Sequence, residues 1–300
     1  MKNEYWSFGV GNFGEKHINV LKTIKKFNII GFFDINHKRA KEIEKNHNIK
    51  SYDDPINLIK KCDAIDIVTK TSSHFELIQL GIRHNKHIFI EKPICSKKKE
   101  IDNILKITSD YSPVIQVGHI ERYNPAMDLE ITEEISKIDS KRTGTINERN
   151  KDISIALDLM IHDIDLILNL TKSNIIEIQA QDNNKNMTHN DITCTLTFEN
   201  GTKAILNSER GNNIKTRREM NIYSKSKTIN IDFLKRTQTI KTNHKIKQVI
   251  TQKDVNPLKK ELVEFYENIA LNKQPKVGIT EACNAVNIAL EIDNLTKTKR

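Results

Sequence analysis

Short apolar runs alternate with helical patterns over the first 118 residues of the chain. The apolar runs predict strands, and the segments between them repeat their apolar positions at helical spacing. Because each intervening segment is long enough for a right-handed crossover, the strands should form a parallel sheet. The predicted strands are Tyr5–Val10, Asn28–Asp34, Ala64–Thr69, His87–Glu91 and Pro113–Gly118, and the predicted helices are Glu15–Lys26, His37–Asn46, Pro55–Lys61, Ser73–Asn85 and Lys97–Ser109.

From about residue 174 to 242 the pattern changes to β-rich stretches separated by turn residues such as Glu199-Asn200-Gly201. This arrangement is typical of an antiparallel sheet. The predicted strands are 175–180, 192–198, 203–208, 219–223 and 227–231, and helices follow near 258–271 and 280–295. We therefore expect an α/β domain over residues 1–118 and an α+β domain over residues 119–300. The C-terminal helix, residues 280–297, is a candidate to pack back on the first domain.

The segment Phe8-Gly9-Val10-Gly11-Asn12-Phe13-Gly14 contains G-x-G-x-x-G where the first strand gives way to the first helix. Gly9 would make a tight turn, Gly11 would let a pyrophosphate approach the backbone, and Gly14 would allow close helix–strand packing. The helix N-terminus supplies N–H groups for phosphates. Asp34 ends the second strand 20 residues after Gly14, where a carboxylate accepts hydrogen bonds from ribose hydroxyls. A dinucleotide-binding Rossmann-type domain is predicted, with NAD favoured over NADP because an acidic side chain repels a 2′-phosphate.

The segment Ile153–Leu170 is apolar apart from one polar stripe. At 3.6 residues per turn, the residues that share this stripe are Ser154, Asp158, His162, Asp165 and Asn169. Because the stripe lacks Lys and Glu, it indicates the lining of a cleft. Asp158 and His162, at positions i and i+4, can touch, and a carboxylate beside an imidazole orients it and raises its basicity. A solvent-facing stripe, or a metal site formed by Asp158, His162 and Asp165, is the alternative to such a catalytic pair.

Glu91-Lys92-Pro93 stands at the end of a predicted strand of the first domain. Together with the glycine loop and Asp158-x-x-x-His162-Asp163, it resembles the Gfo/Idh/MocA family of nicotinamide-dependent oxidoreductases over essentially the whole chain. The resemblance implies a Rossmann-type parallel sheet and a second domain with an open-faced, mostly antiparallel sheet. It also implies NAD(P)-dependent oxidation or reduction of a hydroxyl or carbonyl on sugars and polyols. By the same resemblance, Lys92 is the active-site lysine, and Asp158 and His162 complete the catalytic triad.

The resemblance further implies which residues bind the cofactor. They are Gly9, Gly11, Asn12, Phe13, Gly14, Asp34, Thr69, Thr71, His74, Glu91 and Lys92. The family commonly has Thr-Pro-Thr at the position where this chain has Thr69-Lys70-Thr71. Loss of the proline removes a fixed φ angle from a cofactor-facing loop, which favours weaker nicotinamide binding.

A narrower resemblance rests on Gln116-Val117-Gly118-His119-Ile120-Glu121-Arg122-Tyr123-Asn124-Pro125-Ala126, which is similar to the family's branch of UDP-N-acetylglucosamine 3-dehydrogenases. The residues expected to contact substrate are His119, Arg122, Tyr123, Asn124 and His162. Arg122 could pair with a diphosphate. The alternatives are that the segment is an interdomain connection with helix-capping side chains, that the enzyme acts on inositol or another sugar, or that the protein is a non-catalytic NAD-bound regulator.

Composition narrows the partners and the compartment. The 48 Lys and Arg residues outnumber the 39 acidic residues, but they are scattered, which favours a solvated surface over nucleic-acid binding. The chain lacks an apolar run long enough for a membrane span, and its strand-like N-terminus leaves no room for a signal peptide. Four widely spaced cysteines fit a reducing cytoplasm and argue against a structural metal, so no metal is expected. By analogy with the fold, we expect a homodimer or homotetramer formed through residues 174–242.

Overall fold

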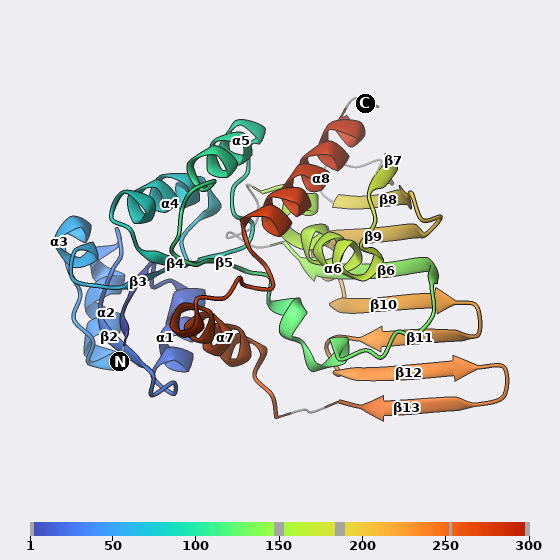
Figure 1. Ribbon diagram of the computed structural model, residues 1–300, viewed down its shortest axis with the longest axis horizontal. Helices are drawn as coiled ribbons and strands as arrows, with labels where there is room; N and C mark the ends of the chain where they lie inside the picture. The colour runs from blue at the N-terminus through green and yellow to red at the C-terminus, as the bar shows by residue number, and fades with distance from the viewer. Residues whose placement is uncertain (1–2, 147–152, 184–189, 252–253, 298–300) are drawn as a thin grey trace. The chain divides into compact units, whose positions relative to one another are not determined.

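The computed structural model describes residues 3–146, 153–183, 190–251 and 254–297, and the chain divides into two compact units (Figure 1). The first unit comprises residues 1–120 and 256–283, and the second comprises residues 121–255 and 284–300. No helix in the described part of the chain is long and apolar enough to cross a membrane.

The first unit is built on a five-stranded parallel sheet in the order β2-β1-β3-β4-β5, which confirms the predicted Rossmann-type sheet. Helices α4 and α5 lie on one face of this sheet, and α1 and α7 lie on the other (Figure 1). Its elements are β1 (Asn3–Phe8), α1 (Asn12–Leu21), β2 (Phe27–Phe33), α2 (His37–His47), α3 (Pro55–Ile59), β3 (Ala64–Ile67), η1 (Thr71–Ser73), α4 (His74–Arg83), β4 (His87–Glu91), α5 (Lys98–Ile107), β5 (Ile115–Gly118) and α7 (Pro257–Leu271).

Helix α7 belongs to the first unit, although it lies far along the chain and the sequence placed it in the second domain. Leu258, Leu262 and Phe265 of α7 join a buried cluster with residues of β1 and α1, including Tyr5 and Leu21. Burying such side chains stabilises the unit by about 1.5–3 kcal/mol each. The predicted domains were two continuous stretches of the chain, whereas the first unit combines its N-terminal residues with residues 256–283. Most of helix α8 (Ile279–Lys297), from Asn284 onward, is grouped with the second unit.

The second unit is built on an eight-stranded sheet in the order β13-β12-β11-β10-β6-β9-β8-β7, and all neighbours pair antiparallel except β6 and β9. Its elements are η2 (Ile120–Tyr123), η3 (Pro125–Met127), β6 (Ile135–Thr145), the π-helical turn η4 (Ala156–Met160), α6 (Ile161–Thr171), β7 (Ile175–Asp182), β8 (Asn190–Phe198), β9 (Lys203–Gly211), β10 (Arg217–Ser224), β11 (Lys227–Asp232), β12 (Thr237–Thr242) and β13 (Ile246–Ile250). The predicted sheet, mostly antiparallel, is confirmed.

Strand β6 occupies the middle of this sheet, yet the hydrophobic pattern did not reveal it. Its interior face carries Ser140 and Arg142, both buried, where a typical strand would carry apolar side chains. The Arg142 guanidinium is neutralised by Asp163, with Nη2–Oδ1 at 2.8 Å, and by Glu121, with Nη1–Oε1 at 2.9 Å. A buried charge needs such partners, and none of them lies near Arg142 in the sequence.

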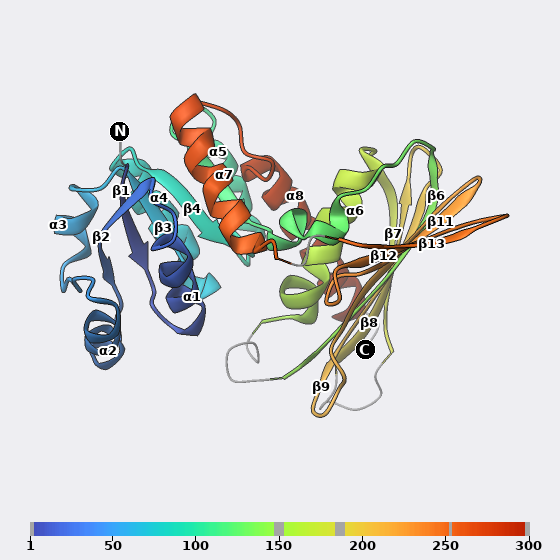
Figure 2. The same ribbon diagram turned by 90° about the horizontal axis from the view of Figure 1, so that it is seen from below.

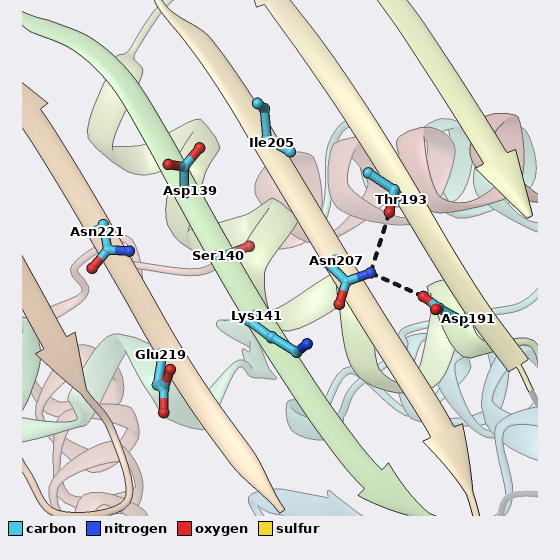
Figure 3. Close-up of a pocket in the computed structure, with 9 residues that line it drawn as sticks. All are labelled: Asp139, Ser140, Lys141, Asp191, Thr193, Ile205, Asn207, Glu219 and Asn221. Carbon is cyan, nitrogen blue, oxygen red and sulfur yellow. Dashed lines mark hydrogen bonds between the residues drawn. The ribbon is translucent and has the colours of Figure 1, made fainter. Parts of the chain in front are cut away.

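One face of the eight-stranded sheet packs against α6, and the other carries no described element of the second unit (Figure 2). A pocket of about 390 Å³ lies between strands β8, β9, β6 and β10 of the sheet (Figure 3). Its lining residues are Asp139, Ser140, Lys141, Asp191, Thr193, Ile205, Asn207, Glu219 and Asn221. Asn207 Nδ2 donates to Asp191 Oδ1 at 2.9 Å and to Thr193 Oγ1 at 3.2 Å (Figure 3). The lining is polar apart from one isoleucine and carries both signs of charge.

Candidate active site

The glycine loop joins β1 to α1 in a conformation that only small residues permit. Gly9 has a φ of +83°, and a Cβ atom added there would lie 2.7 Å from the Val68 carbonyl oxygen. A Cβ atom on Gly14 would lie 2.0 Å from the Gly9 carbonyl oxygen. Nothing lies within 4 Å of a Cβ atom on Gly11, which is the N-cap of α1. The loop therefore packs tightly on the inside and stays open at Gly11, as a pyrophosphate at a helix N-terminus requires.

Val10, between the first two glycines, is held from both sides. Its N–H donates to Asp34 Oδ2 at 2.7 Å, and its carbonyl oxygen accepts from Arg39 Nε at 3.0 Å. The Arg39 guanidinium also pairs with Glu15 at 2.6 Å and with Glu42 at 2.9 Å. Asp34 thus positions the phosphate loop, and because a carboxylate oxygen has two acceptor sites it can still accept from a ribose hydroxyl.

His74 connects two further loops that the sequence assigned to the cofactor. Its ring is buried, with Nδ1 2.9 Å from the Pro93 carbonyl oxygen and Nε2 3.3 Å from the Thr69 carbonyl oxygen. Burial lowers the pKa of His74, so the ring is neutral at pH 7. Because a neutral imidazole carries one N–H group, the ring donates to only one of these two carbonyl oxygens at a time. His74 braces these loops from the interior, while Thr69 and Thr71 are half-buried at the loop itself.

Lys70 replaces the proline that the family resemblance leads one to expect, but its backbone has a φ of −70° and a ψ of 143°. Proline is fixed near a φ of −65°. We therefore expect Lys70→Pro to increase the free energy of unfolding by about 0.4–1 kcal/mol, because it restricts the unfolded chain without straining the folded one. Urea denaturation of both proteins measures the difference. A decrease in stability would show that the loop needs the Lys70 N–H group.

Glu91 is the last residue of β4, and Lys92 follows it. Lys92 is half-buried, and its peptide bond to Pro93 is cis. The Glu91 side chain is buried, and its Oε1 lies 3.3 Å from Nε2 of His17. The structure therefore directs Glu91 into the interior of the first unit.

The polar helix of the second unit starts with a π-helical turn, Ala156–Met160, and continues as α6. Such turns are frequent at functional sites. Asp158 lies in this turn, and its Oδ2 accepts from Arg210 Nη1 at 3.0 Å. His162, four residues later, is half-buried in the first turn of α6. Because the first turn is wider than the 3.6 residues assumed, the predicted stripe is not a single face.

Asp165, which the sequence placed on that stripe, is buried and receives the Arg122 guanidinium. Arg122 Nε donates to Oδ2 at 2.6 Å and Nη2 donates to Oδ1 at 2.9 Å. This bidentate pair engages the arginine that was predicted to meet a diphosphate. Because both Asp165 oxygens accept from Arg122, Asp165 does not suit the alternative of a metal site formed with Asp158 and His162. Among the described residues, no group of three or more His, Cys, Asp and Glu side chains could hold a metal ion.

The other residues predicted to contact substrate are mostly interior. His119 and Tyr123 are buried. Asn124 caps η3 by accepting from Ala126 N at 3.0 Å, and its amide donates to Glu121 Oε2 at 2.9 Å. Asn124 is therefore a helix-capping residue, as the alternative interpretation of this segment expected.

Two arginines that matter to the site were not predicted from the sequence. Arg210, on β9, holds Asp158 and also donates to the Ile153 carbonyl oxygen at 2.8 Å. Arg39 holds Val10 of the phosphate loop. The alternation of buried and partly exposed positions along β9 puts Arg210 on the buried side, and a buried arginine needs an acidic partner. No other feature of the sequence indicates Arg210. Arg39 lies five residues after Asp34, in the predicted helix 37–46, and no local pattern marks it.

A Rossmann sheet with this glycine loop, joined in one chain to an open eight-stranded sheet, defines an NAD-binding oxidoreductase. Residues 7–119 match the oxidoreductase family with an NAD-binding Rossmann fold, and residues 134–230 match the GFO/IDH/MocA C-terminal domain. The chain belongs to the Gfo/Idh/MocA family. Its relatives include dehydrogenases that act on sugars and polyols, and the chain is an oxidoreductase of the class that acts on CH–OH donors.

Two relatives illustrate the range of the family. UDP-N-acetylglucosamine 3-dehydrogenase from Acidithiobacillus ferrooxidans is 30% identical over 233 residues, which cover 76% of this chain and 74% of the relative. Its solved structure has a TM-score of 0.91 at 26% identity and covers 99% of both chains. Myo-inositol 2-dehydrogenase from Thermotoga maritima is 27% identical over 119 residues, 39% of this chain and 36% of the relative.

A third comparison concerns the fold alone. Scyllo-inositol dehydrogenase from Lactobacillus casei, solved with bound NAD(H) and scyllo-inositol, has a TM-score of 0.83 at 19% identity. The alignment covers 100% of this chain and 98% of the other.

Proposed function

We propose that the protein is an NAD-dependent dehydrogenase that oxidises the C3 hydroxyl of UDP-N-acetylglucosamine. The observation that carries this proposal is the similarity to UDP-N-acetylglucosamine 3-dehydrogenase, which extends through both units at 30% identity. The myo-inositol 2-dehydrogenase from Thermotoga maritima, in contrast, matches 39% of the chain. The 3-keto sugar formed would be a substrate for an aminotransferase that makes a 3-amino sugar.

The proposed mechanism assigns one role to each of three residues. His162 accepts the hydroxyl proton as the carbon–hydrogen bond breaks, and Lys92 donates a hydrogen bond to the same oxygen and stabilises its developing negative charge. Asp158 orients the imidazole, and Arg210, at 3.0 Å, holds the Asp158 carboxylate. Bound nicotinamide would supply the hydride acceptor. The residues of the first unit fit that cofactor, because the loop is open only at Gly11.

The selection of NAD over NADP follows from Asp34 and Arg39. A 2′-phosphate would meet the Asp34 carboxylate, and the guanidinium that could offset it is already paired with Glu15 and Glu42. We expect the Kd for NADPH to exceed that for NADH at least about tenfold, or by about 1.4 kcal/mol. Energy transfer from Trp6, the single tryptophan, to bound nicotinamide measures both constants. Equal affinities would contradict this assignment.

We further propose that copies of the chain associate through the uncovered face of the eight-stranded sheet, forming a dimer or a tetramer. The mixed charges around the pocket on this face, with Asp139 and Glu219 beside Lys141, suit a self-complementary contact.

The four free cysteines are all buried, and burial raises the pKa of Cys62, Cys95, Cys194 and Cys283 to about 12. Unpaired thiols support our proposal of a reducing cytoplasmic compartment.

A substrate panel tests the proposed activity against its alternatives. We expect kcat/KM with UDP-N-acetylglucosamine to exceed that with myo-inositol, scyllo-inositol and unlinked N-acetylglucosamine by a factor of at least about 100, or about 2.7 kcal/mol of transition-state binding. A higher kcat/KM with an inositol would contradict the UDP-sugar assignment and identify the inositol as the better substrate. NADH binding without turnover on any member of the panel would favour a non-catalytic NAD-bound regulator.

A further inference from the structure

Three ionisable side chains form a buried line inside the first unit. His17 of α1 lies between Asp66 of β3 and Glu91 of β4, with Nδ1–Oδ2 at 3.0 Å and Nε2–Oε1 at 3.3 Å. His17 and Asp66 are completely buried, and Glu91 is nearly so. Each ring nitrogen therefore faces a carboxylate.

His17 Nδ1 is hydrogen-bonded to Asp66, whereas Nε2 faces Glu91 Oε1 at ion-pair distance without a hydrogen bond. Because a neutral imidazole carries one N–H group, only the protonated ring attracts both carboxylates. Burial alone would lower the pKa of His17, but Asp66 and Glu91 together raise it to about 10. Burial raises the pKa of Asp66, and the His17 charge opposes that rise. The other titratable groups that these carboxylates affect are Tyr5 on β1 and His74 on α4. The line therefore consists of an imidazolium between two acids.

Stability does not explain this arrangement. Taking three charges out of water is costly, and replacing a buried ion network by apolar side chains of similar volume is often neutral or stabilising. What the line does provide is a fixed geometry between three elements. It ties α1, which begins at the phosphate loop, to β3 and to the last residue of β4.

Glu91 has little freedom to move at the end of this line. A Cβ atom at Gly118 on the neighbouring strand β5 would lie 2.7 Å from Glu91 Oε1, so the carboxylate is seated against that backbone. Glu91 is the last residue of β4, and Lys92 follows it directly. Fixing the Glu91 side chain on the interior side thus restrains the backbone from which the Lys92 side chain projects.

We infer that His17, Asp66 and Glu91 are positioning residues for Lys92, with the His17 imidazolium holding Glu91 in place. This inference rests on the role proposed above for Lys92. It assigns Glu91 an indirect function in place of the cofactor contact that the family resemblance implied.

The test compares Glu91→Leu, which removes the acceptor at similar volume, with Glu91→Gln, which keeps an acceptor and loses the charge. Both leave the His17–Asp66 pair, so the fold should persist. We expect kcat to fall about 100-fold in Glu91→Leu, because misplacing a catalytic group by about 1 Å can lower the rate by that factor. In Glu91→Gln, which keeps an acceptor, kcat should fall about tenfold. KM should change less than about threefold in both variants. Glu100→Gln is the matched control. Glu100, on α5, accepts a hydrogen bond from the Ser96 N–H group in the loop that follows Lys92, so the same substitution is made near Lys92 without touching His17.

Hydrogen exchange at the amides of Lys92 and Ile94 supplies a second readout that needs no substrate. It should accelerate at least about tenfold in Glu91→Leu and stay unchanged in Glu100→Gln. A Glu91→Leu variant with wild-type kcat, or with unchanged exchange, would overturn the inference. Accelerated exchange in a protein whose wild type never turns over UDP-N-acetylglucosamine would support the positioning role and reject the proposed substrate.

Discussion

Replacing His162 by Asn should lower kcat by about 1,000-fold, because general base catalysis contributes about 10²–10⁴-fold. Lys92→Met should have an effect of similar size, since an electrostatic stabiliser of a developing oxyanion contributes about 10²–10³-fold. The Kd for NADH should change little in either variant, because the phosphate loop and Asp34 are intact. Steady-state kinetics and energy transfer from Trp6 measure the two quantities separately.

Thr171→Ser is the control for His162→Asn, because Thr171 lies at the far end of the same helix and donates to the Ile167 carbonyl oxygen at 2.9 Å, a bond that serine retains. Its kcat should equal that of the wild type. If His162→Asn turned over within about tenfold of the wild type, another residue would have to be the base. A large loss of NADH affinity in Lys92→Met would instead make Lys92 a cofactor-binding residue.

Gly14→Ala should destabilise the first unit by about 3 kcal/mol, the upper range for an added methyl group in a packed site. The new Cβ atom would lie 2.0 Å from the backbone oxygen of Gly9, and no side chain is available to move aside. NADH binding should be lost with the loop geometry. Urea denaturation and energy transfer from Trp6 test both expectations.

Gly11→Ala separates packing from cofactor binding at the same loop. Gly11 has a φ of −59°, and a Cβ atom there meets nothing within 4 Å, so the free energy of unfolding should be unchanged. NADH affinity should nevertheless fall at least about tenfold, because the methyl group occupies the place where a pyrophosphate approaches the backbone. Wild-type NADH affinity in Gly11→Ala would argue that the cofactor does not use this loop.

The parallel sheet and the glycine loop could be predicted because their signals are local. The strands of the first unit are short segments rich in apolar residues, and the loop needs glycines at fixed spacing. Strand β6 escaped prediction because its interior positions hold Ser140 and Arg142. Strands β12 and β13 escaped because polar residues interrupt their apolar positions and, of the two strands, only Gln238 is buried. Strand β13 lies at the edge of the sheet, where little burial is expected.

The partners of the site residues could not be predicted, because they lie far apart in the chain. Arg210 reaches Asp158 from 52 residues away, and Arg122 reaches Asp165 from 43 residues away. His17 stands three residues after Gly14, and nothing in that spacing identifies Asp66, 49 residues further on, as its partner. Residue type and helical periodicity indicated where chemistry lies, whereas tertiary packing decided which charges meet.

The most direct test of the central claim uses UDP-N-acetylglucosamine deuterated at C3 together with NAD. An aminotransferase and an amino donor remove the keto product, and mass spectrometry then measures the reduced nicotinamide. Our account predicts reduced cofactor one mass unit heavier than NADH, formed by the wild-type protein and about 1,000-fold more slowly by His162→Asn. Unlabelled NADH from the deuterated sugar, or no NADH from a protein that binds the cofactor, would contradict hydride transfer from C3 of this substrate.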